Sequence, residues 1–313
     1  MLYNFLLFCL NKKIMNYRKF PRTGWSISEV GLGCWAIGSE WGNVNESDSI
    51  TALKTAIDQG VNFFDTADVY GDGRSEKLIG KVLKTSSEKI YVATKSGRRL
   101  NPHTASGYNL KNIENFIDRS LFNLNTDSID LLQLHCPPSD ICDKKEIYEM
   151  MDFFVTKGKI KNYGVSVEKV SEALAAINFP NVKSIQIIFN IFRQKPLENF
   201  FFKASKKNVG IIVRVPLASG LLTGKMSLSS TFPENDHRNY NIKGEAFDIG
   251  ETFSGVNFKK GLEAVRELKS ILPDNFSLSN LALKWILMHP EVSVVIPGAK
   301  NDKQVIENVN SSK

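Results

Sequence analysis

Four titratable side chains stand at or just after the ends of short apolar segments of this 313-residue chain. Asp65 ends one segment, Lys95 ends the next and His135 ends a third, while Tyr70 follows Asp65 by five residues. If these segments are neighbouring parallel strands of a barrel, their carboxyl ends meet at one rim. The spacing therefore predicts that a carboxylate, a phenol, an amine and an imidazole gather in a single site.

The four residue types suit proton transfer to a reacting oxygen. The pKa of a free phenol is roughly 10, so a phenol that acts as an acid near neutrality needs a cation that favours its anion. Lys95 is expected to supply that charge and to lower the pKa of Tyr70, Asp65 to orient and neutralise Lys95, and His135 to hydrogen-bond the phenol or the reacting oxygen. Taken singly, these residues would equally be a core histidine, a solvated lysine, a packed aromatic and a helix cap.

Short β-branched runs alternate with longer segments of helical spacing, which is typical of parallel βα units. The eight predicted strands are Val30–Ile37, Val61–Thr66, Ile90–Thr94, Ile129–His135, Ile160–Val167, Ser184–Asn190, Gly210–Leu217 and Val292–Gly298. The predicted helices are Ser47–Gln59, Ser75–Lys84, Leu110–Leu124, Lys144–Lys157, Val170–Ile177, Leu197–Lys207, Phe258–Leu272 and Leu278–Met288. Eight such units without a GxGxxG turn predict an α/β fold, a closed (β/α)8 TIM barrel, rather than an open doubly wound sheet.

Composition narrows the class of protein. The chain is 42% apolar and 23% charged, which excludes disordered and collagen-like proteins. Its net charge is +7, from 40 basic and 33 acidic residues, but the basic residues are scattered, so no nucleic-acid partner is expected. The four cysteines include no CxxC pair, which favours a cytoplasmic, reducing location and no metal site. Neither a membrane association nor an oligomeric state is indicated.

The chain is predicted to form one domain over residues 15–313, because no linker or internal repeat interrupts it. Residues 1–14 precede a second methionine, Met15, and are interpreted as an N-terminal extension or as the product of a wrongly assigned start codon. The apolar stretch Tyr3 to Leu10 is too short to cross a bilayer. The segment from Thr223 to Val256 is long and polar, so it is predicted to be a lid or binding loop.

Several segments resemble the aldo-keto reductase family, in particular its bacterial-type and channel-subunit-like members. They are Asn62-Phe63-Phe64-Asp65-Thr66-Ala67-Asp68-Val69-Tyr70-Gly71, Val92-Ala93-Thr94-Lys95 and Gln133-Leu134-His135. The resemblance runs from about Met15 to Asn308 and implies a barrel that uses NADP(H). It implies that Tyr70 donates a proton to a carbonyl oxygen while hydride reaches the carbonyl carbon from the nicotinamide. His135 would orient that carbonyl.

The resemblance also implies a cofactor site around the later strand ends. Ser166 and Gln186 occupy positions similar to those that hold the nicotinamide carboxamide, although Val167 replaces the usual asparagine. Arg214 stands where many members place an aromatic under the nicotinamide, and a planar guanidinium also stacks on rings; a structural ion pair is the alternative. The segment from Leu217 to Lys225 resembles the pyrophosphate strap. From this region we assign Pro216, Leu217, Ser219, Gly220 and Lys225 to the cofactor.

The last predicted site lies at the start of the final helix. Residues similar to an adenosine site are Gly298, Lys300, Gln304, Glu307 and Asn308. Lys300 is expected to meet a 2′-phosphate, which favours NADP(H), with NAD(H) not excluded because Gly298 and Gln304 replace basic residues of many members. Trp35 matches an aromatic that lines the family pocket and joins the predicted cofactor set.

Three residues of the long loop are left with two interpretations. Asp236, His237 and Arg238 of the long loop reach the cofactor or substrate, or form a polar surface. Cys136 has no evident cationic partner in the sequence and is interpreted as structural.

The leading hypothesis is an NADPH-dependent reductase acting on a small-molecule carbonyl substrate. A barrel aldolase or isomerase with Lys95 as a Schiff-base nucleophile is a second hypothesis, opposed by the Asp65 counter-ion that keeps the amine protonated. An NADPH-binding sensor or accessory subunit with little turnover is a third.

Overall fold

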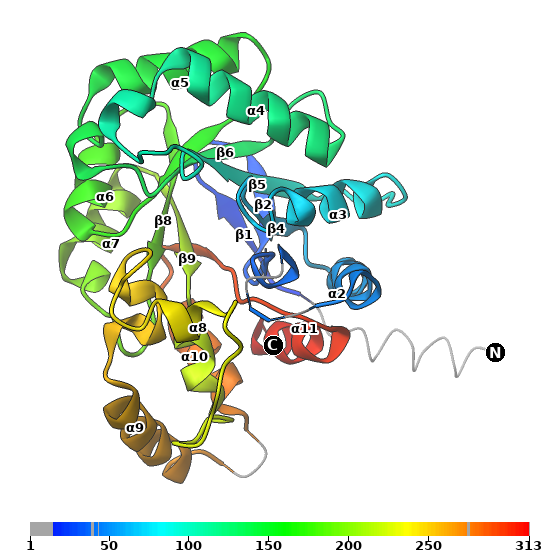
Figure 1. Ribbon diagram of the computed structural model, residues 1–313, viewed down its shortest axis with the longest axis vertical. Helices are drawn as coiled ribbons and strands as arrows, with labels where there is room; N and C mark the ends of the chain where they lie inside the picture. Colours follow the sequence, from blue (N-terminus) through cyan, green and yellow to red (C-terminus); the bar gives the residue numbers. More distant parts are fainter. Residues whose placement is uncertain (1–14, 39–40, 43, 274–275, 313) are drawn as a thin grey trace.

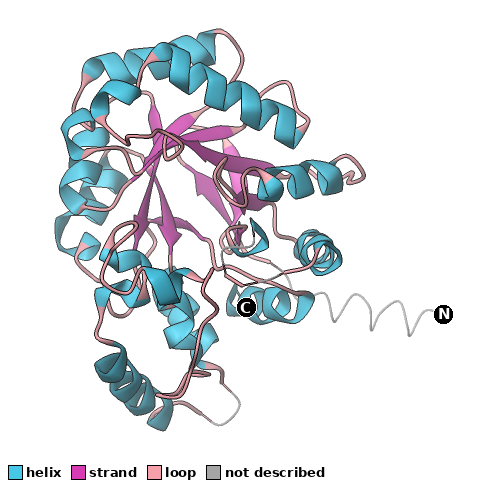
Figure 2. Ribbon diagram, in the orientation of Figure 1, coloured by secondary structure: helices cyan, strands magenta, loops and turns pink. Residues whose placement is uncertain are grey.

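The structure is a computed structural model that describes residues 15–38, 41–42, 44–273 and 276–312. Residues 1–14, for which the sequence predicts an extension or a wrongly assigned start, lie outside the described residues. Strands converge in the middle of the molecule and helices surround them (Figures 1 and 2).

Eight parallel strands form the barrel wall in chain order. They are β3 (Leu32–Gly33), β4 (Phe63–Asp65), β5 (Tyr91–Ser96), β6 (Leu131–His135), β7 (Tyr163–Ser166), β8 (Val182–Ile188), β9 (Gly210–Arg214) and β10 (Val292–Val295). The wall closes between its first and last strands, where Val30 pairs with Val295 and Gly33 with Gly298. Each predicted strand overlaps one of these eight, so the (β/α)8 barrel predicted from the periodicity is confirmed.

Helices cover the outside of the wall in the predicted order. They are α2 (Glu46–Asp58), α3 (Arg74–Leu83), α4 (Leu110–Leu124), α5 (Lys145–Thr156), α6 (Val170–Ala176), α7 (Pro196–Lys206), α9 (Phe258–Ser270), α10 (Leu278–Leu287) and α11 (Asp302–Val309). The apolar faces of most of these helices pack on outward-facing strand residues in one large buried cluster, whereas Leu262 and Val265 of α9 belong to a separate cluster with Leu221 and Phe253 of the segment after β9. None of the helices in the described part of the chain has the length and apolar character needed to cross a membrane.

A hairpin that the sequence analysis missed closes the amino end of the barrel. Strands β1 (Tyr17–Phe20) and β2 (Trp25–Ser28) pair antiparallel. Phe20 and Ile27 are fully buried against inward-facing barrel residues such as Phe63 and Leu131. Because β1 and β2 have four residues each, they are too short for period-two alternation to stand out in the sequence.

The long segment between β9 and α9 lies across the other end of the barrel. It contains four short helices: η4 (Ala218–Thr223), α8 (His237–Tyr240), η5 (Ile249–Glu251) and η6 (Phe253–Gly255). Much of this segment is buried on its inner side, including His237 and Phe253. The fold therefore provides a packed floor at one end of the barrel and a loop-covered chamber at the other.

Candidate active site at the carboxyl ends of the strands

A buried ion pair joins β4 to β5. Asp65 ends β4 and pairs in register with Ala93, so Lys95 lies two residues further toward the rim. The Lys95 Nζ donates to Asp65 Oδ1 at 2.5 Å and to the Thr66 carbonyl at 2.8 Å, and it lies 3.3 Å from the Tyr70 hydroxyl. Asp65 is 3% exposed and Lys95 1%. The ammonium group therefore has an acceptor for each of its three hydrogens.

Two glutamines fix the other oxygen of Asp65. The Nε2 atoms of Gln186 in β8 and Gln133 in β6 donate to Asp65 Oδ2 at 2.7 and 3.1 Å. Ser166 of β7 donates from Oγ to Gln186 Oε1 at 3.3 Å. Gln133 was not predicted as a site residue, although a glutamine inside the apolar run of β6 is a usable signal. Side chains from the four strands β5 to β8 thus hold the carboxylate of β4 in a single orientation.

Tyr70 is held over this ion pair by the loop between β4 and α3. The next residue, Gly71, has φ +59°, and a Cβ there would overlap the Gly38 carbonyl, so the turn requires glycine. The Tyr70 ring stacks on Trp35 at 5.8 Å between centroids and meets the His135 ring edge-on at 5.9 Å. The loop therefore aims the phenol between the lysine and the imidazole.

The electrostatics of Tyr70 differ from the sequence prediction. Burial raises the pKa of Tyr70 well above its ordinary value, and the negative charges of Asp65 and Glu251 add to that rise. The cations that oppose it are the guanidinium groups of Arg98 and Arg214. The expected lowering of this pKa is therefore not found, because burial has the largest effect and makes the net shift upward. Tyr70 therefore carries its proton near neutral pH.

His135 is a neutral imidazole in this site. Burial lowers the pKa of His135 well below its ordinary value, and the nearby cations Arg98, Lys95 and Arg214 lower it further. Its Nδ1 atom has no hydrogen-bond partner. A neutral ring beside a protonated phenol is suited to hydrogen-bond a polar group that enters the pocket.

Two arginines and two glutamates form a charge cluster beside Tyr70. Arg214, the last residue of β9, forms an ion pair with Glu251 of η5 and donates to the Val167 carbonyl at 3.0 Å. Arg98 lies 3.0 Å from Glu168 and 3.5 Å from Glu251. Arg214 therefore forms the structural ion pair that the sequence analysis gave as the alternative to stacking on the nicotinamide. Its side chain also lines the pocket.

The interpretation that Cys136 lacks a cationic partner is wrong. Arg214 Nη2 lies 3.7 Å from Cys136 Sγ, and both Arg98 and Arg214 act to lower the pKa of this thiol. Burial has the larger effect, so the pKa of Cys136 is raised and the thiol stays protonated. Cys136 approaches Glu168 and Glu251 closely enough for the three to hold a metal ion. The two glutamates are already paired with guanidinium groups, so we assign no metal site to them.

The strap after β9 has an unusual backbone. Ser219 and Gly220 adopt left-handed conformations with φ 56° and 90° inside η4. The Ser219 Oγ donates to the Glu251 carbonyl at 2.7 Å, which ties the strap to the long loop. Left-handed conformations turn backbone amides toward a common side, which is the geometry of anion-binding turns. At the end of the strap, the Lys225 Nζ lies 3.2 Å from a Glu307 carboxylate oxygen of α11.

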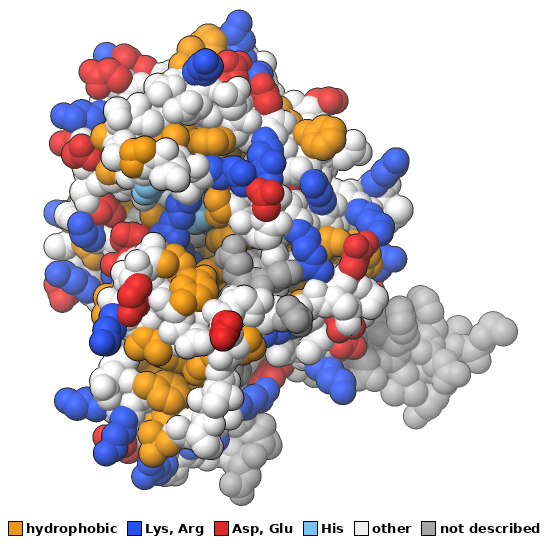
Figure 3. Space-filling view, viewed as in Figure 1, with side chains coloured by type: hydrophobic (Ala, Val, Ile, Leu, Met, Phe, Trp, Pro, Cys, Tyr) orange, Lys and Arg blue, Asp and Glu red, His pale blue; other side chains and the backbone are white. Residues whose placement is uncertain are grey.

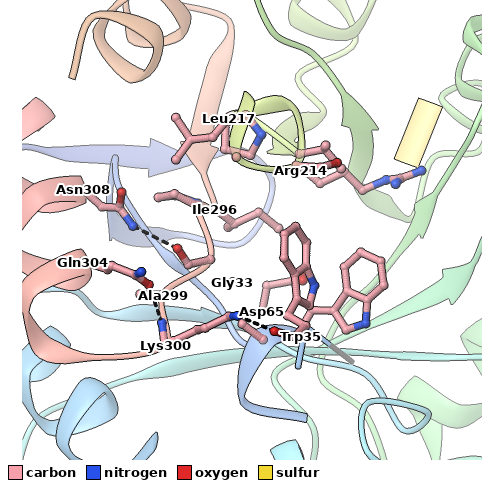
Figure 4. A pocket seen from close by; sticks show the side chains of 18 of the residues that line it. Gly33, Trp35, Asp65, Arg214, Leu217, Ile296, Ala299, Lys300, Gln304 and Asn308 are labelled. Atoms are coloured by element: carbon pink, nitrogen blue, oxygen red, sulfur yellow. Dashed lines mark hydrogen bonds between the residues drawn. The ribbon is translucent and has the colours of Figure 1, made fainter. Parts of the chain in front are cut away.

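The far end of the pocket is built on the start of α11. The Asn301 side chain accepts a hydrogen bond from the Gln304 backbone at 3.0 Å and caps the helix. In return, the Gln304 side chain accepts from the Lys300 backbone at 2.8 Å, and Asn308 donates to the Gly298 carbonyl at 3.2 Å (Figure 4). Burial lowers the pKa of Lys300, and its Nζ donates to the Trp41 carbonyl.

The long loop contributes buried groups rather than a polar surface. His237 is fully buried, and its ring stacks on Trp35 at 4.8 Å and meets Trp41 edge-on at 4.4 Å. Asp236 is also buried and forms an ion pair with Arg238 at 2.6 Å. Asp236 and His237 therefore do not form a solvated surface, and of the three residues left open only Arg238 lines the pocket.

One pocket of about 350 Å³ unites these parts. Every site residue predicted from the sequence lines it except Lys95, which lies behind Asp65 and Tyr70. On the face shown in Figure 3, histidine atoms are visible in a central recess between apolar and basic side chains. Lining residues that the prediction missed are Gly33, Ala36, Trp41, Arg98, Val215, Thr223, Met226, Glu251, Ser279, Ile296, Pro297 and Ala299. Arg238, left open above, lines the pocket as well.

The missed residues differ in how visible they are in the sequence. Arg98 follows the strand-end Lys95 by three residues, so the rule that chemistry lies at the carboxyl ends of strands would have found it. Glu251 carries no such signal, because the fold of the long loop alone brings it to Arg214.

Comparisons with known proteins agree with this geometry. Residues 29–313 match the aldo/keto reductase family. The chain is 32% identical over 301 residues to the aldo-keto reductase YhdN of Bacillus subtilis, which covers 93% of this chain and 87% of YhdN. It is 27% identical over 312 residues to a probable voltage-gated potassium channel subunit beta of Oryza sativa subsp. japonica, covering 95% and 91%.

A solved structure shows the same architecture. The holo form of aldo-keto reductase AKR11C1 from Bacillus halodurans superposes with a TM-score of 0.76 at 28% identity, covering 96% of this chain and 91% of that one. The chain therefore belongs to the aldo/keto reductase family.

Proposed function

We propose that this chain is an NADPH-dependent oxidoreductase that reduces aldehydes or ketones to alcohols, with Tyr70 as the general acid. The observation that carries the proposal is the contact of the Tyr70 hydroxyl with Lys95 at 3.3 Å, beside His135 and inside the pocket. A protonated phenol in a buried site is a proton donor whose proton leaves only when a developing oxyanion demands it. This is the protonation state that carbonyl reduction needs.

Tyr70, Lys95 and His135 have separate tasks in this mechanism. A carbonyl oxygen between the Tyr70 hydroxyl and the imidazole receives a hydrogen bond from each side. As negative charge builds on that oxygen, Tyr70 transfers its proton, and the phenolate left behind is stabilised by the Lys95 ammonium at 3.3 Å. Asp65 holds the Lys95 ammonium group in place. Arg98 and Arg214 add positive charge around the same phenolate.

The residues along the pocket fit a dinucleotide cofactor. The pocket extends from Tyr70 past the left-handed backbone of Ser219 and Gly220 to the start of α11. Ser166, Gln186, Trp35 and Arg214 would surround the nicotinamide end; Pro216, Leu217, Ser219, Gly220 and Lys225 would hold the pyrophosphate; and Gly298, Lys300, Gln304, Glu307 and Asn308 would hold the adenosine end. When bound, the nicotinamide supplies hydride to the carbonyl carbon.

A preference for NADP(H) over NAD(H) is supported by the basic groups at the adenosine end. Lys300 and Arg238 both line the pocket, and their charges act on each other. A 2′-phosphate between them would relieve that repulsion and accept charge-assisted hydrogen bonds. NAD(H) lacks this phosphate, so we expect it to bind more weakly rather than not at all.

Replacing the phenol tests the general acid. We expect Tyr70→Phe to lower kcat for para-nitrobenzaldehyde by about 10²- to 10⁴-fold, measured by the loss of NADPH absorbance, while NADPH still binds. Tyr91→Phe is the matched control, because Tyr91 stacks on Trp25 at the opposite end of the barrel. Full turnover by Tyr70→Phe would contradict the assigned mechanism.

An NADPH-binding sensor or accessory subunit is the second candidate function. It is favoured by the likeness to a protein named as a channel subunit beta. The two candidates are separated by turnover: the sensor binds NADPH tightly but leaves a broad panel of aldehydes unreduced, and it co-purifies with a partner.

Two further proposals concern the whole chain. The absence of a CxxC pair supports a cytoplasmic location, and the second methionine, Met15, supports a domain boundary at residue 15.

A further inference from the structure

A second cavity opens beside the reacting end of the pocket. Its volume is about 640 Å³, and it shares Trp35, Tyr70, Arg98 and His135 with the first. The two groups that would contact a carbonyl oxygen, Tyr70 and His135, therefore face both spaces. A substrate whose carbonyl reaches Tyr70 has room for the rest of its body here.

Apolar and aromatic surfaces frame this second cavity. Trp35 and Phe247 lie edge to face with their ring centroids 5.9 Å apart, and Tyr240 and Val69 extend the apolar wall. The Arg98 guanidinium lies over the Phe247 ring at 5.5 Å. Such walls suit a flat apolar or aromatic body.

The charged side chains that line the cavity are each paired with an opposite charge. Arg98 lies 3.0 Å from Glu168, and Lys169 lies 3.7 Å from Glu172. Asp248 lies 3.0 Å from Arg193.

The remaining basic groups of this lining are two histidines, His103 and His135, and the neutral state of His135 is described above. His103 Nε2 lies 2.8 Å from the Tyr108 hydroxyl, and burial together with Arg98 lowers the pKa of His103. It is therefore neutral near pH 7. Each cation in this lining already has a carboxylate partner, so none is available to bind an incoming anion.

Of the two cations in this lining, Arg98 is the one that also lines the first cavity, and its charge acts on Tyr70 and His135. Glu168 covers it from the side of the second cavity. A substrate carboxylate would have to displace the Glu168 carboxylate from Arg98 and would bring a second negative charge close to it. Like charges juxtaposed in a partly buried site exclude a ligand effectively.

We propose that the second cavity binds the body of a neutral carbonyl compound, aromatic or apolar, and that Glu168 excludes carboxylate-bearing substrates by occupying Arg98. This inference rests on the proposed reductase function and adds the substrate class to it. Glu168 acts as a specificity-determining residue rather than as a catalytic one.

A matched pair of substrates tests the proposal. para-Carboxybenzaldehyde is anionic at neutral pH, whereas its methyl ester has the same ring and aldehyde without the charge. We expect the unmodified protein to reduce the ester with a kcat/KM at least about tenfold above that of the acid, equivalent to ~1.4 kcal/mol. Equal values for the two substrates would overturn the proposal. Failure to reduce either would count against the reductase function instead.

Variants locate the selectivity. We expect Glu168→Gln, or Glu168→Ser should the first not fold, to lower the ester-to-acid ratio about tenfold. The same substitution combined with Arg98→Met should restore the ratio, because the acid loses the cation that the first change made available. Asp248→Asn removes a different carboxylate from the same cavity, and its ratio should change less than twofold. An unchanged ratio in both Glu168 variants, or an equal fall in Asp248→Asn, would refute the role of Glu168.

Discussion

Two regions of the molecule build the same pocket in different ways. On one side, Asp65, Lys95, Gln133 and Gln186 are held by strand register, and their side chains form one buried hydrogen-bonded network. On the other side, the long loop after β9 brings Arg238 and Glu251 to the pocket and packs His237 against Trp35, through side-chain contacts across a chain segment without strands. Strand register holds the first group as rigidly as the barrel itself, whereas a loop held by side-chain contacts is expected to open at a lower free energy than the barrel.

The largest expected effect comes from the strand network. Lys95→Met leaves the Asp65 carboxylate buried without its cation, and removal of one partner of a buried ion pair costs about 3–5 kcal/mol. We expect the free energy of unfolding, measured with urea, to fall by that amount for the whole barrel, together with loss of turnover.

The matched control is Lys89→Met, whose Nζ lies 3.9 Å from Asp130 with 65% of its side chain exposed. Exposed pairs contribute about 0–1 kcal/mol, so this variant should unfold almost like the parent protein. Equal losses in the two variants would show that burial of the Lys95 pair has no energetic consequence.

The strand side was predictable because local patterns report it. Asp65, Lys95 and His135 end apolar runs, and the rule that barrel chemistry lies at the carboxyl ends of strands brings them together without any knowledge of the loops. Gln133 was predictable in the same way and was overlooked. The two-residue length of β3 was not, since Ala36–Gly38 turns into a short helix after an apolar run that continues to Ile37.

The loop side was not predictable, because its positions depend on tertiary contacts. The length and polarity of residues 223–256 indicated a lid, but nothing in the local sequence pairs Glu251 with Arg214 or stacks His237 on Trp35. The raised pKa of Tyr70 has the same origin: it is set mainly by burial, and Glu251 from this loop adds to it. Local sequence patterns were therefore enough to predict which side chains react. The pKa values of those side chains depend on burial and on charges that only the packed fold brings near them.

The second prediction uses pH to open the loop side alone. Burial lowers the pKa of His237 from 6.5 to about 4, opposed by the negative charges of Asp236 and Glu251 and assisted by Arg238. The open loop therefore binds a proton below pH 6.5 while the closed loop does not until about pH 4, so closure weakens as the pH falls through that interval. The loss amounts to about 3 kcal/mol in total.

Hydrogen exchange measures this opening directly. The amides of residues 237–256 should lose protection between pH 6.5 and 4, beyond the intrinsic change in exchange rate, while amides of β5 and β6 should not. His237→Phe keeps an aromatic ring against Trp35 and cannot titrate, so its loop protection should be flat over the same range. Parallel losses in the loop and in the strands would mean that the two regions open together.

The third prediction concerns the ion pair that closes the loop. Glu251→Gln keeps the size of the side chain but removes the charge that faces Arg214, and hydrogen bonds to charged groups contribute about 1.5–3 kcal/mol. We expect cleavage of the long loop by a protease to become about 30-fold faster, the equivalent of ~2 kcal/mol. The urea midpoint should fall less than in Lys95→Met.

Asp248→Asn is the control within the same loop. Its partner Arg193 lies 3.0 Å away, and the side chains are 20% and 26% exposed. We expect this partly solvated pair to change the cleavage rate only severalfold, for a contribution of about 1 kcal/mol or less. If Asp248→Asn opened the loop as much as Glu251→Gln, burial of the Arg214 pair would not be what holds it closed.

The smallest expected effect compares two helix caps, one at the pocket and one away from it. Asn301 caps α11 by accepting from the Gln304 backbone, and Asn257 caps α9 by accepting from the Lys260 backbone. Either asparagine changed to alanine should cost about 1 kcal/mol of stability, because each leaves one helix-terminal amide without its acceptor. Only Asn301→Ala should also weaken NADPH binding, by a few fold in a fluorescence titration. The reason is that Lys300 and Gln304 line the pocket on either side of this cap, whereas no residue of α9 lines it. Equal NADPH affinity in the two variants would mean that the start of α11 does not hold the cofactor, and would contradict the proposed adenosine site.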